Sequence, residues 1–405
     1  MRHSISRRRF VQCAGLATIA APNIITSKAL GAADGTPPAS ERITLGGIGV
    51  GGRGSGVLGE LMRDKRTQLV AACDVKKDAR EHWAKRNGVD GYVDYRELIA
   101  RDDVDLVMCG TPDHWHAQIT IDAMKAGKDI FCEKPLSLTI GEGRKMVDTA
   151  RRYARVFSCG SQRVIGDYGR LACAARSGKY GAILQAHATP GGPPRHCYLP
   201  GQGDPVADGV EWDLWLGPAP WAPYHPWRHG RAYGLSGKGF RTWYDYSGGM
   251  MTDWGGHKFG GAMHGMGVDH TGPTDIIYPG NQGCDHLTYV FANGMQLIVG
   301  GGQKYICEKG EAKPFQGMPL PPPGLRWYRK GAHTPTQDVI NCVVERRKPF
   351  RDVEFAHRVA SVCHLGNICL MLKRDLKWDP DREVFIGDPE ANRLIDRPRR
   401  GPWQI

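Results

Sequence analysis

The sequence predicts an α/β protein of two parts: a doubly wound parallel sheet, followed by an α+β part with an open, largely antiparallel sheet. Three observations support this. Strand and helix patterns alternate from residue 42 to about residue 158, as in βαβ units. A glycine-rich turn joins the first strand pattern to the first helix pattern. Beyond residue 158 the strand patterns are isolated, and residues 189–250 are rich in Gly, Pro, Trp, Tyr and His.

The first part shows four strand patterns and several helix patterns. Apolar runs that stop at glycine or polar residues predict strands at residues 43–50, 69–74, 104–110 and 129–132. Helical spacing predicts helices near residues 57–62, 78–86, 95–100 and from 116 to Gly127. Thr139 and Glu142 have the spacing of a capping box, which predicts a further helix after them.

The second part has weaker signals. Strand patterns occur at residues 183–188, 286–291 and 295–299, and residues 319–324 indicate an exposed loop. Helical spacing returns at residues 336–346 and 355–373. We therefore expect the second part to contain both strands and helices and to end in helices.

Length and composition fit a folded protein with a large core. The chain has 405 residues, of which 41% are hydrophobic and 24% charged. Its net charge is +12, but no basic stripe with interleaved aromatic residues predicts nucleic-acid binding. The twelve cysteines are scattered without C-x-x-C spacing. We therefore expect buried free thiols rather than disulfides or a metal finger, among them Cys73, Cys109, Cys132, Cys363 and Cys369.

The N-terminal segment, residues 1–33, resembles a twin-arginine (Tat) export signal. Arg7, Arg8 and Arg9 precede a short apolar run over residues 13–21, and small residues follow at Ala29, Gly31, Ala32 and Ala33. This predicts a periplasmic protein, and the alternative is a disordered basic tail. No later stretch approaches the length of a transmembrane helix, so we expect no membrane span in the mature chain.

The glycine-rich turn has the spacing G-x-G-x-x-G. It follows a predicted strand, opens a predicted helix and precedes Asp74, which ends the next strand 20 residues past Gly54. In a Rossmann domain such glycines let the backbone approach a pyrophosphate at the helix N-terminus, and the acidic residue binds the adenosine ribose. We expect NAD rather than NADP, although Lys76 and Lys77 weaken that preference; the alternative is that the glycines serve only tight turns. The candidate cofactor residues are Gly49, Gly51, Gly52, Arg53, Gly54 and Asp74.

Two polar clusters are candidates for chemistry. Lys134, between Glu133 and Pro135, ends the fourth predicted strand, and its ammonium group can donate to a substrate hydroxyl. Asp253 and His257 are four residues apart, so on one helix they share a face and can move a hydroxyl proton. The alternatives are a solvated lysine, a helix cap beside a packed histidine, or a metal site, for which no ligand spacing is present. No role is assigned to His187, His196, His264 and His270.

These motifs, with the segment from Thr111 to His116, resemble the glucose–fructose oxidoreductase / inositol dehydrogenase / MocA family over nearly the whole chain after residue 33. Residues 212–218, 253–255 and 378–380 resemble a bacterial, signal-bearing branch of it. The expected organisation is a dinucleotide-binding Rossmann domain at 40–158, a substrate and oligomerisation domain at 159–335, and C-terminal helices and a tail at 336–405 that pack back across both.

The resemblance also implies roles for single residues. Lys134, Asp253 and His257 match the catalytic lysine, aspartate and histidine. The residues implied at the cofactor are Thr111, Pro112, His116, Glu133 and Lys134, with Pro112 and His116 beside the nicotinamide. Lys258 departs from the family's pattern, because an acidic residue is common after the histidine.

The expected function is hydride transfer at a ring carbinol of a sugar, polyol or glycoside. Because an exported protein meets little free NAD, we expect a retained cofactor and a redox-neutral cycle, in a homo-oligomer (a dimer or a tetramer). The alternatives are a redox-assisted glycosidase, lyase or epimerase, or a non-catalytic sugar- or NAD-binding protein. Aromatic residues that either stack on sugar or only pack are Trp212, Trp215, Trp221, Trp227, Trp243 and Tyr244.

Overall fold

The computed structural model describes residues 35–195, 203–230, 239–328 and 330–405. The chain divides into two compact units, residues 1–42 and 43–405. In the first unit, the described residues contain one 3-10 helix, η1 (Ala39–Glu41). The predicted export signal at residues 1–33 lies outside the described residues and stays a prediction. Both sheets and the cavity discussed below belong to the second unit.

Six parallel strands form the first sheet, in the order β3-β2-β1-β4-β5-β6. The strands are β1 (Ile43–Ile48), β2 (Thr67–Cys73), β3 (Asp90–Tyr92), β4 (Leu106–Cys109), β5 (Asp129–Cys132) and β6 (Phe157–Cys159). Because β2 and β4 lie on opposite sides of β1, the sheet is doubly wound, as the alternating patterns predict. The sequence analysis misses β3 and β6, since three residues are too few to show a period.

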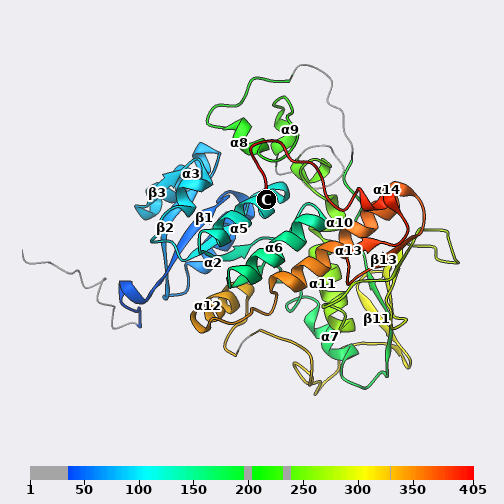
Figure 1. Ribbon diagram of the computed structural model, residues 1–405. Coiled ribbons are helices and arrows are strands. Elements are labelled where there is room, and N and C mark those ends of the chain that lie inside the picture. The colour runs from blue at the N-terminus through cyan, green and yellow to red at the C-terminus, as the bar shows by residue number, and fades with distance from the viewer. Residues whose placement is uncertain (1–34, 196–202, 231–238, 329) are drawn as a thin grey trace, which may run out of the picture. The chain divides into compact units, whose positions relative to one another are not determined.

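Helices cover both faces of this sheet (Figure 1). They are α2 (Gly52–Leu61), α3 (Lys77–Asn87), α4 (Tyr95–Ile99), α5 (Asp113–Lys125) and α6 (Ile140–Arg152). One face packs against α4, α5 and α6, and the other against α2 and α3. α12 (Pro335–Glu345) comes from much later in the chain and packs on α2. The core of the first sheet is therefore completed from the C-terminal part of the sequence.

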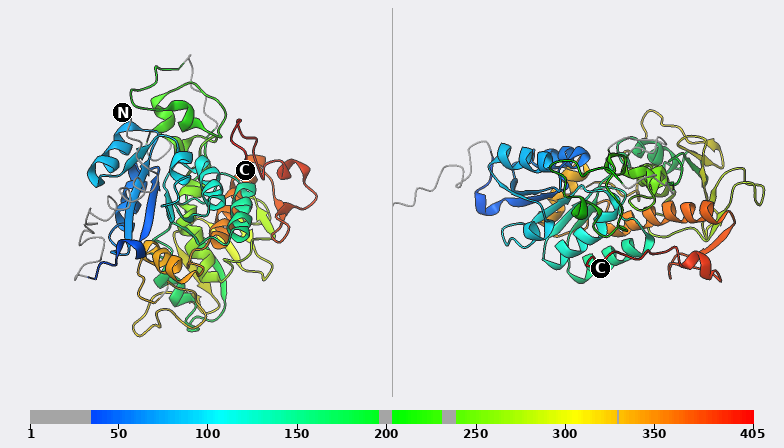
Figure 2. Two further views of the ribbon diagram at one scale, coloured as in Figure 1. Left: turned by 60° about the vertical axis from the view of Figure 1, so that its left-hand side comes forward. Right: turned by 90° about the horizontal axis from the view of Figure 1, so that it is seen from above.

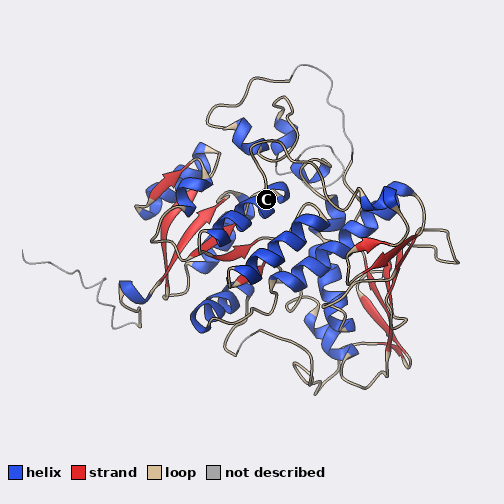
Figure 3. Cartoon of the chain, in the orientation of Figure 1, coloured by secondary structure: helices blue, strands red, loops and turns tan. Residues whose placement is uncertain are grey.

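The second sheet has eight strands, in the order β12-β11-β7-β10-β9-β8-β13-β14. They are β7 (Ile183–Ala188), β8 (Asp275–Ile277), β9 (Thr288–Val290), β10 (Gln296–Val299), β11 (Lys304–Cys307), β12 (Gly310–Glu311), β13 (Leu376–Asp379) and β14 (Val384–Phe385). Among the described strands β7 and β10 pair in parallel and the other pairs are antiparallel, which confirms the predicted fold class (Figure 3). β13 and β14 correct the expectation that the chain ends in helices alone; both are too short to show alternation.

Helices also fill the space between the two sheets. They are α7 (Gly169–Ala175), α10 (Gly249–Asp253), α11 (Gly255–Met266) and α13 (Val353–Leu372). Their apolar side chains share one core with the second sheet. α13 packs against α11 on one side and α6 on the other, which places it between the sheets (Figure 2). The remaining short elements are α8 (Trp212–Leu216), α9 (Pro226–His229), η2 (Phe240–Thr242) and α14 (Pro389–Asn392).

α13 corrects one expectation about membrane spans. The sequence analysis finds no stretch of transmembrane length after the N-terminal segment, yet α13 is long and apolar enough to cross a membrane by length and composition alone. Inside the protein, 78% of its most apolar window is buried. A largely apolar helix suits a position between two packed layers, and α13 occupies such a position.

Candidate active site

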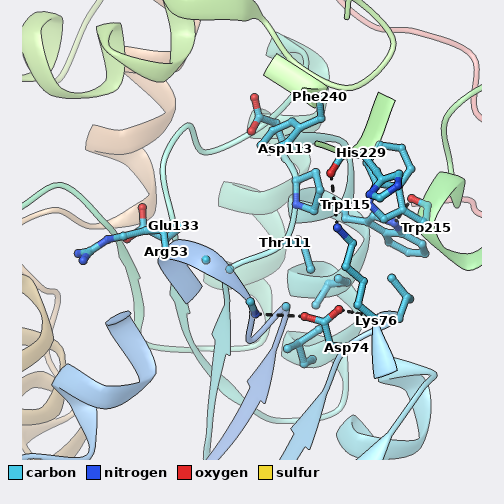
Figure 4. Close-up of a pocket in the computed structure, with 18 of the residues that line it drawn as sticks. Arg53, Asp74, Lys76, Thr111, Asp113, Trp115, Glu133, Trp215, His229 and Phe240 are labelled. Carbon is cyan, nitrogen blue, oxygen red and sulfur yellow. Dashed lines mark hydrogen bonds and ion pairs between the residues drawn. The ribbon is translucent and has the colours of Figure 1, made fainter. Parts of the chain in front are cut away.

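One large cavity, about 450 Å³ in volume, lies at the carboxyl edge of the parallel sheet. The ends of β1, β2, β4 and β5 form one wall, and α10, the start of α11 and parts of residues 214–241 form the other. Doubly wound sheets bind their ligands at this edge. Every residue assigned from the sequence to the cofactor or to catalysis lines this cavity, except Gly54 and His116. Figure 4 shows residues of both walls, among them Asp74 and Thr111 on the sheet side and Trp215 and His229 on the other.

The glycine-rich turn between β1 and α2 forms one end of the cavity. Gly49 has a φ of +73°, and a Cβ there would lie 2.6 Å from the amide nitrogen of Thr111. Gly54 lies behind the turn, where a Cβ would come within 2.0 Å of the Gly49 carbonyl oxygen. α2 begins at Gly52 with no side-chain cap and no acidic residue in its first turn. Its N-terminus therefore fits the pyrophosphate of a dinucleotide.

Asp74 follows β2 and lies beside the glycine-rich turn (Figure 4). Its Oδ2 accepts a hydrogen bond from the Gly51 amide at 3.1 Å, and its Oδ1 accepts one from the Lys76 amide at 2.9 Å. Burial raises the pKa of Asp74, although these hydrogen bonds and the Lys76 charge oppose that rise. Each carboxylate oxygen keeps a lone pair for a further donor, so the site fits the hydroxyl groups of an adenosine ribose.

His116 ties two strand ends together beneath the cavity. Its Nδ1 lies 2.7 Å from the carbonyl oxygen of Pro135, and its Nε2 lies 2.9 Å from that of Thr111. The side chain is buried, and both ring nitrogens are already occupied by the backbone. His116 therefore supports the loops after β4 and β5 instead of facing the cavity, whereas Pro112 lines it.

Lys134 and Asp253 form a buried ion pair at the other end of the cavity. The Nζ of Lys134 lies 2.6 Å from Oδ1 of Asp253, and the two side chains are 10% and 3% exposed. Arg241 donates from Nε to the same Oδ1 at 3.0 Å. Burial alone would raise the pKa of Asp253, but the charges of Lys134 and Arg241 hold it below its ordinary value. Glu133, which precedes the lysine, accepts from Nε of Arg53 at 3.2 Å and so links this strand to the glycine-rich turn.

His257 lines the same end of the cavity as a neutral imidazole. Its Nδ1 lies 2.7 Å from Oγ of Ser161, and within the described parts of the chain Nε2 has no hydrogen-bond partner. Burial and the positive charges of Lys134 and Arg351 lower the pKa of His257 to about 2. The ring can therefore donate from one nitrogen and accept at the other.

Asp253 and His257 share the cavity but not one helix, contrary to the expectation from their spacing. α10 ends at Asp253 and α11 begins at Gly255. The His257 amide bonds the Trp254 carbonyl oxygen at 3.0 Å, one residue nearer than α-helical pairing requires. Two successive glycines after Trp254 favour this break because glycine is a poor helix former.

Four contributors to this end of the cavity escape the sequence analysis, namely Ser161, Arg163, Arg241 and Trp254. Ser161 and Arg163 follow β6, so recognition of that strand would have placed them at the same sheet edge. Trp254 lies between Asp253 and His257, and its neighbours could have drawn attention to it. Arg241 lies in the short 3-10 helix η2, whose three residues show no periodicity, and no local signal marks it.

The aromatic-rich segment mostly packs rather than facing a ligand. Trp212, Trp215 and Trp243 are buried in one cluster with Tyr246. Trp215 alone of the six predicted aromatic residues lines the cavity, whereas Trp221 and Trp227 are exposed at 68% and 42%. The packing alternative therefore holds for Trp212 and Trp243.

The cysteines and the metal alternative can be judged together. Ten cysteines lie in the described residues, all as free thiols and nine of them buried, as expected. Across the described ranges, the one group with metal-ligand geometry is Cys109, His116 and Cys132. Neither Asp253 nor His257 belongs to it, and the ring nitrogens of His116 already face carbonyl oxygens.

Solved structures resemble this fold at low sequence identity. GenD2 from gentamicin A biosynthesis, in complex with NAD, is 19% identical with a TM-score of 0.56, and the match covers 84% of this chain and 97% of that one. Myo-inositol 2-dehydrogenase from Lactobacillus plantarum is also 19% identical with a TM-score of 0.56, over 83% and 99% of the two chains. These likenesses support the fold.

Curated relatives are more similar over a shorter stretch. "Glycosyl hydrolase family 109 protein 1" of Shewanella sp. (strain ANA-3) is 33% identical over 213 residues, 46% of either chain. "Alpha-N-acetylgalactosaminidase" of Shewanella oneidensis is 32% identical over the same length. The chain thus spans about half the length of the curated relatives that it matches.

Two family models match consecutive parts of the chain. The oxidoreductase family's NAD-binding Rossmann fold matches residues 43–161, and its C-terminal alpha/beta domain matches residues 200–405. The first match contains the glycine-rich turn, Asp74 and Lys134, and the second contains Asp253 and His257. With an NAD-binding Rossmann domain and the C-terminal domain both present, the chain belongs to the glucose–fructose oxidoreductase / inositol dehydrogenase / MocA family of oxidoreductases.

Proposed function

We propose that the protein oxidises a ring hydroxyl of a sugar, polyol or glycoside with NAD that it retains, and that its cycle is redox-neutral. The observation that carries this proposal is the joint placement of Lys134, Asp253 and His257 in the cavity that the glycine-rich turn and Asp74 also line. When bound, NAD supplies a hydride acceptor that can later return the hydride.

The residues at the substrate end have complementary tasks. Asp253 fixes the Lys134 ammonium group, which is then aimed to donate to the substrate oxygen as it becomes a carbonyl. If the His257 proton lies on Nδ1 and is donated to Ser161, the lone pair on Nε2 accepts the hydroxyl proton as the hydride leaves. Arg241 holds Asp253 from a second direction and keeps it ionised.

Retention of the cofactor is supported by a cover segment, residues 203–230, which crosses the β2 side of the cavity. The Lys77 amide donates to the Gly209 carbonyl oxygen at 2.8 Å, and the Glu211 amide donates to the Val75 carbonyl oxygen at 3.0 Å. Further along, the Trp215 carbonyl oxygen accepts from Trp115 Nε1 at 3.0 Å. These bonds hold the segment over the end of the cavity that contains Asp74.

The C-terminal tail holds the cover segment in place. Arg400 donates from Nη1 to the Asp213 carboxylate at 2.5 Å and from Nε to the Gly217 carbonyl oxygen at 3.0 Å. Trp403 packs edge-on against Trp115, with ring centroids 4.8 Å apart. Exit of a bound dinucleotide past the segment therefore requires several contacts to break together, which favours slow release.

Asp74 favours NAD over NADP. The Asp74 carboxylate is already held by two backbone amides. It would repel the 2′-phosphate of NADP, and NADP would lack the 2′-hydroxyl that donates to this carboxylate in NAD. We expect Asp74→Ser to weaken NAD binding and to narrow the difference between the two cofactors, as titration of the stripped protein with each nucleotide would measure.

Cleavage of a glycosidic bond is the second candidate, favoured by the names of the curated relatives. Oxidation of a ring hydroxyl acidifies the C–H next to the new carbonyl. Loss of that proton and of the alcohol leaving group breaks the glycosidic bond, water then adds to the unsaturated ketone, and the returned hydride restores the ring hydroxyl. This route uses the same residues and consumes no cofactor, so it is compatible with retention.

The deciding experiment measures cofactor content after extensive dialysis and denaturation. We expect near-stoichiometric NAD(H) in the purified protein and less in a variant whose tail is loosened at Arg400. Turnover only with added NAD would identify an ordinary dehydrogenase and refute retention. If the purified protein contains no nucleotide and binds none when it is added, the oxidoreductase proposal is refuted. The proposed periplasmic location is a separate question, which cell fractionation tests.

A further inference from the structure

Several cations lie around His257 at the substrate end of the cavity. Lys134 and Arg241 both bond to Asp253, and the buried carboxylate of Asp113 also interacts with Arg241. Arg351 is buried behind this end and donates to the carbonyl oxygens of Gly160 and Gly256. In the described residues no carboxylate pairs with Arg351. The charges of Lys134, Arg351 and Arg163 all lower the pKa of His257 whereas Asp253 raises it, so a group that binds beside His257 meets a positive field.

Trp254 extends this positive region along the cavity wall. The guanidinium carbon of Arg163 lies 5.0 Å from the centroid of the Trp254 ring, and the Nζ of Lys258 lies 5.4 Å from it. Both Arg163 and Trp254 line the cavity. One half-buried indole thus has two cations beside it.

Lys258 has no negative partner in the described parts of the chain. Its Nζ donates to the carbonyl oxygen of Thr189 at 2.5 Å, and the charge of Arg163 acts on it. Burial and the Arg163 charge both lower the pKa of Lys258. Residues 196–202 and 231–238 contain no Asp or Glu in their sequence. Arg163 itself pairs with Asp167, on a solvent-exposed side.

We propose that the substrate carries an anionic group, a carboxylate or a sulfate, which Arg163 and Lys258 bind while the sugar ring lies against Trp254. This inference rests on the proposed function and adds the substrate class to it. Arg163 makes the charge of Lys258 less favourable beside the apolar ring, although Asp167 pairs with Arg163. A bound anion offsets that effect and accepts hydrogen bonds from both groups, and it also fixes the register of the sugar relative to Lys134.

A packing role alone accounts poorly for this arrangement. Apolar side chains would cover the indole of Trp254 without bringing two like charges together. The bond from Lys258 to Thr189 uses one of three ammonium N–H groups, which leaves donors for a ligand. A charge arrangement that local packing does not require is the expected mark of a binding site.

The test compares charged and neutral sugars on the NAD-loaded protein. The probes are methyl glucuronides, methyl galacturonides and the 6-sulfates of methyl glucoside and galactoside, with the neutral methyl glycosides as reference, in both anomers. Binding is followed by calorimetry. We expect the best charged probe to bind about tenfold or more tightly than its neutral counterpart, the scale of one charged hydrogen bond, with a preference that falls as salt rises.

Variants assign the preference to the two cations. Lys258→Met and Arg163→Met should each reduce the preference for the charged probe several-fold. Lys309→Met is the control: it replaces an exposed lysine in the turn between β11 and β12 and should leave the preference unchanged. Equal or tighter binding of neutral sugars, a preference that survives both variants, or no binding of any charged probe would overturn the proposal. If charged probes bind preferentially but no hydride is exchanged, the proposed function is refuted and the inference of an anionic substrate stands. If neutral sugars turn over and charged probes bind no more tightly, the proposed function stands and this inference is refuted.

Discussion

Replacement of Lys134 tests the centre of the proposed chemistry. Lys134→Met keeps much of the length and apolar stem of the side chain but removes the ammonium group that lies 2.6 Å from Asp253. The glycine-rich turn and Asp74 are untouched, so we expect the variant to keep its NAD. Loss of cofactor from this variant would show that Lys134 acts mainly in binding.

The expected loss of rate is about 100- to 10,000-fold, the usual contribution of a positioned proton donor or acceptor. Removal of one partner from a buried ion pair costs about 3–5 kcal/mol of folding free energy. Arg241 remains bonded to Oδ1 of Asp253 in the variant, so we expect a cost of about 3 kcal/mol or less. The protein should therefore stay folded while its activity falls.

The charge change also predicts two titrations. After burial, Lys134 is the largest contributor to the low pKa of His257 and the group that most strongly lowers the pKa of Asp253. Without it both pKa values should rise, and that of His257 should move from about 2 toward its ordinary value near 6.5. NMR titration of the imidazole in wild type and variant measures this directly, independently of activity.

The assay follows nicotinamide reduction in the holoenzyme during a single encounter with the best sugar from the panel above. Arg241→Met is the matched control, because it removes the other cation from the same Asp253 oxygen and leaves the ammonium group of Lys134 in place. We expect it to lose less rate than Lys134→Met. Unchanged turnover in Lys134→Met, or an equal loss in both variants, would refute the assignment of the proton donor to Lys134.

Three other perturbations have definite expected outcomes. Gly54→Ala should abolish nucleotide binding or lower the yield of folded protein, because its Cβ would lie 2.0 Å from the Gly49 carbonyl oxygen; nucleotide content and circular dichroism distinguish the two. Arg400→Ala should speed NAD release several-fold at unchanged affinity for sugar, since it frees the cover segment at Asp213; dilution into excess labelled NAD measures the rate, and an unchanged rate would exclude the tail from retention. Acid should destabilise the fold, because burial lowers the pKa of three neutral histidines from 6.5 to about 4 or, for His257, about 2. Below pH 6.5 the unfolded state therefore binds more protons than the folded state, and the stability that is present above pH 6.5 is lost as the pH falls toward about 4. Urea midpoints at pH 7 and pH 5 test this, and a higher midpoint at pH 5 would contradict it. The histidines concerned are His114, His257 and His364.

The sequence predicts the first sheet well because its signals are local. A parallel strand buried on both faces is a continuous apolar run, and the glycine-rich turn must stand at a fixed place between strand and helix. β5 and β7 are predicted to the residue. The second sheet is predicted only as a class, because β8, β12 and β14 have three residues or fewer and their pairing depends on partners far away in the chain.

The candidate site divides in the same way. Lys134 and Asp74 can be found from the sequence, because each ends a strand and all parallel strands end at one edge. Arg241 cannot, since its role exists only through Asp253, which lies 12 residues away. Ser161 could be placed at this edge only by recognising the three-residue strand β6, and its partner His257 lies 96 residues away. The helix break at Trp254 is likewise not predicted by the four-residue spacing of Asp253 and His257. It depends on whether the two glycines after Trp254 interrupt the helix that the neighbouring residues favour.

The two ends of the cavity differ in a way that suits a retained cofactor. At the Asp74 end, the cover segment is bonded to the loop after β2 and is itself held by Arg400. At the other end, the Arg163 side chain is 38% exposed, and Trp254 and Lys258 are half-buried. We therefore expect a sugar to enter and leave where the wall consists of partly exposed side chains, and release of the dinucleotide to require the backbone hydrogen bonds of the cover segment to break. Unequal exchange of the two ligands is the property that a redox-neutral cycle needs, because the hydride must stay in the protein between its removal and its return.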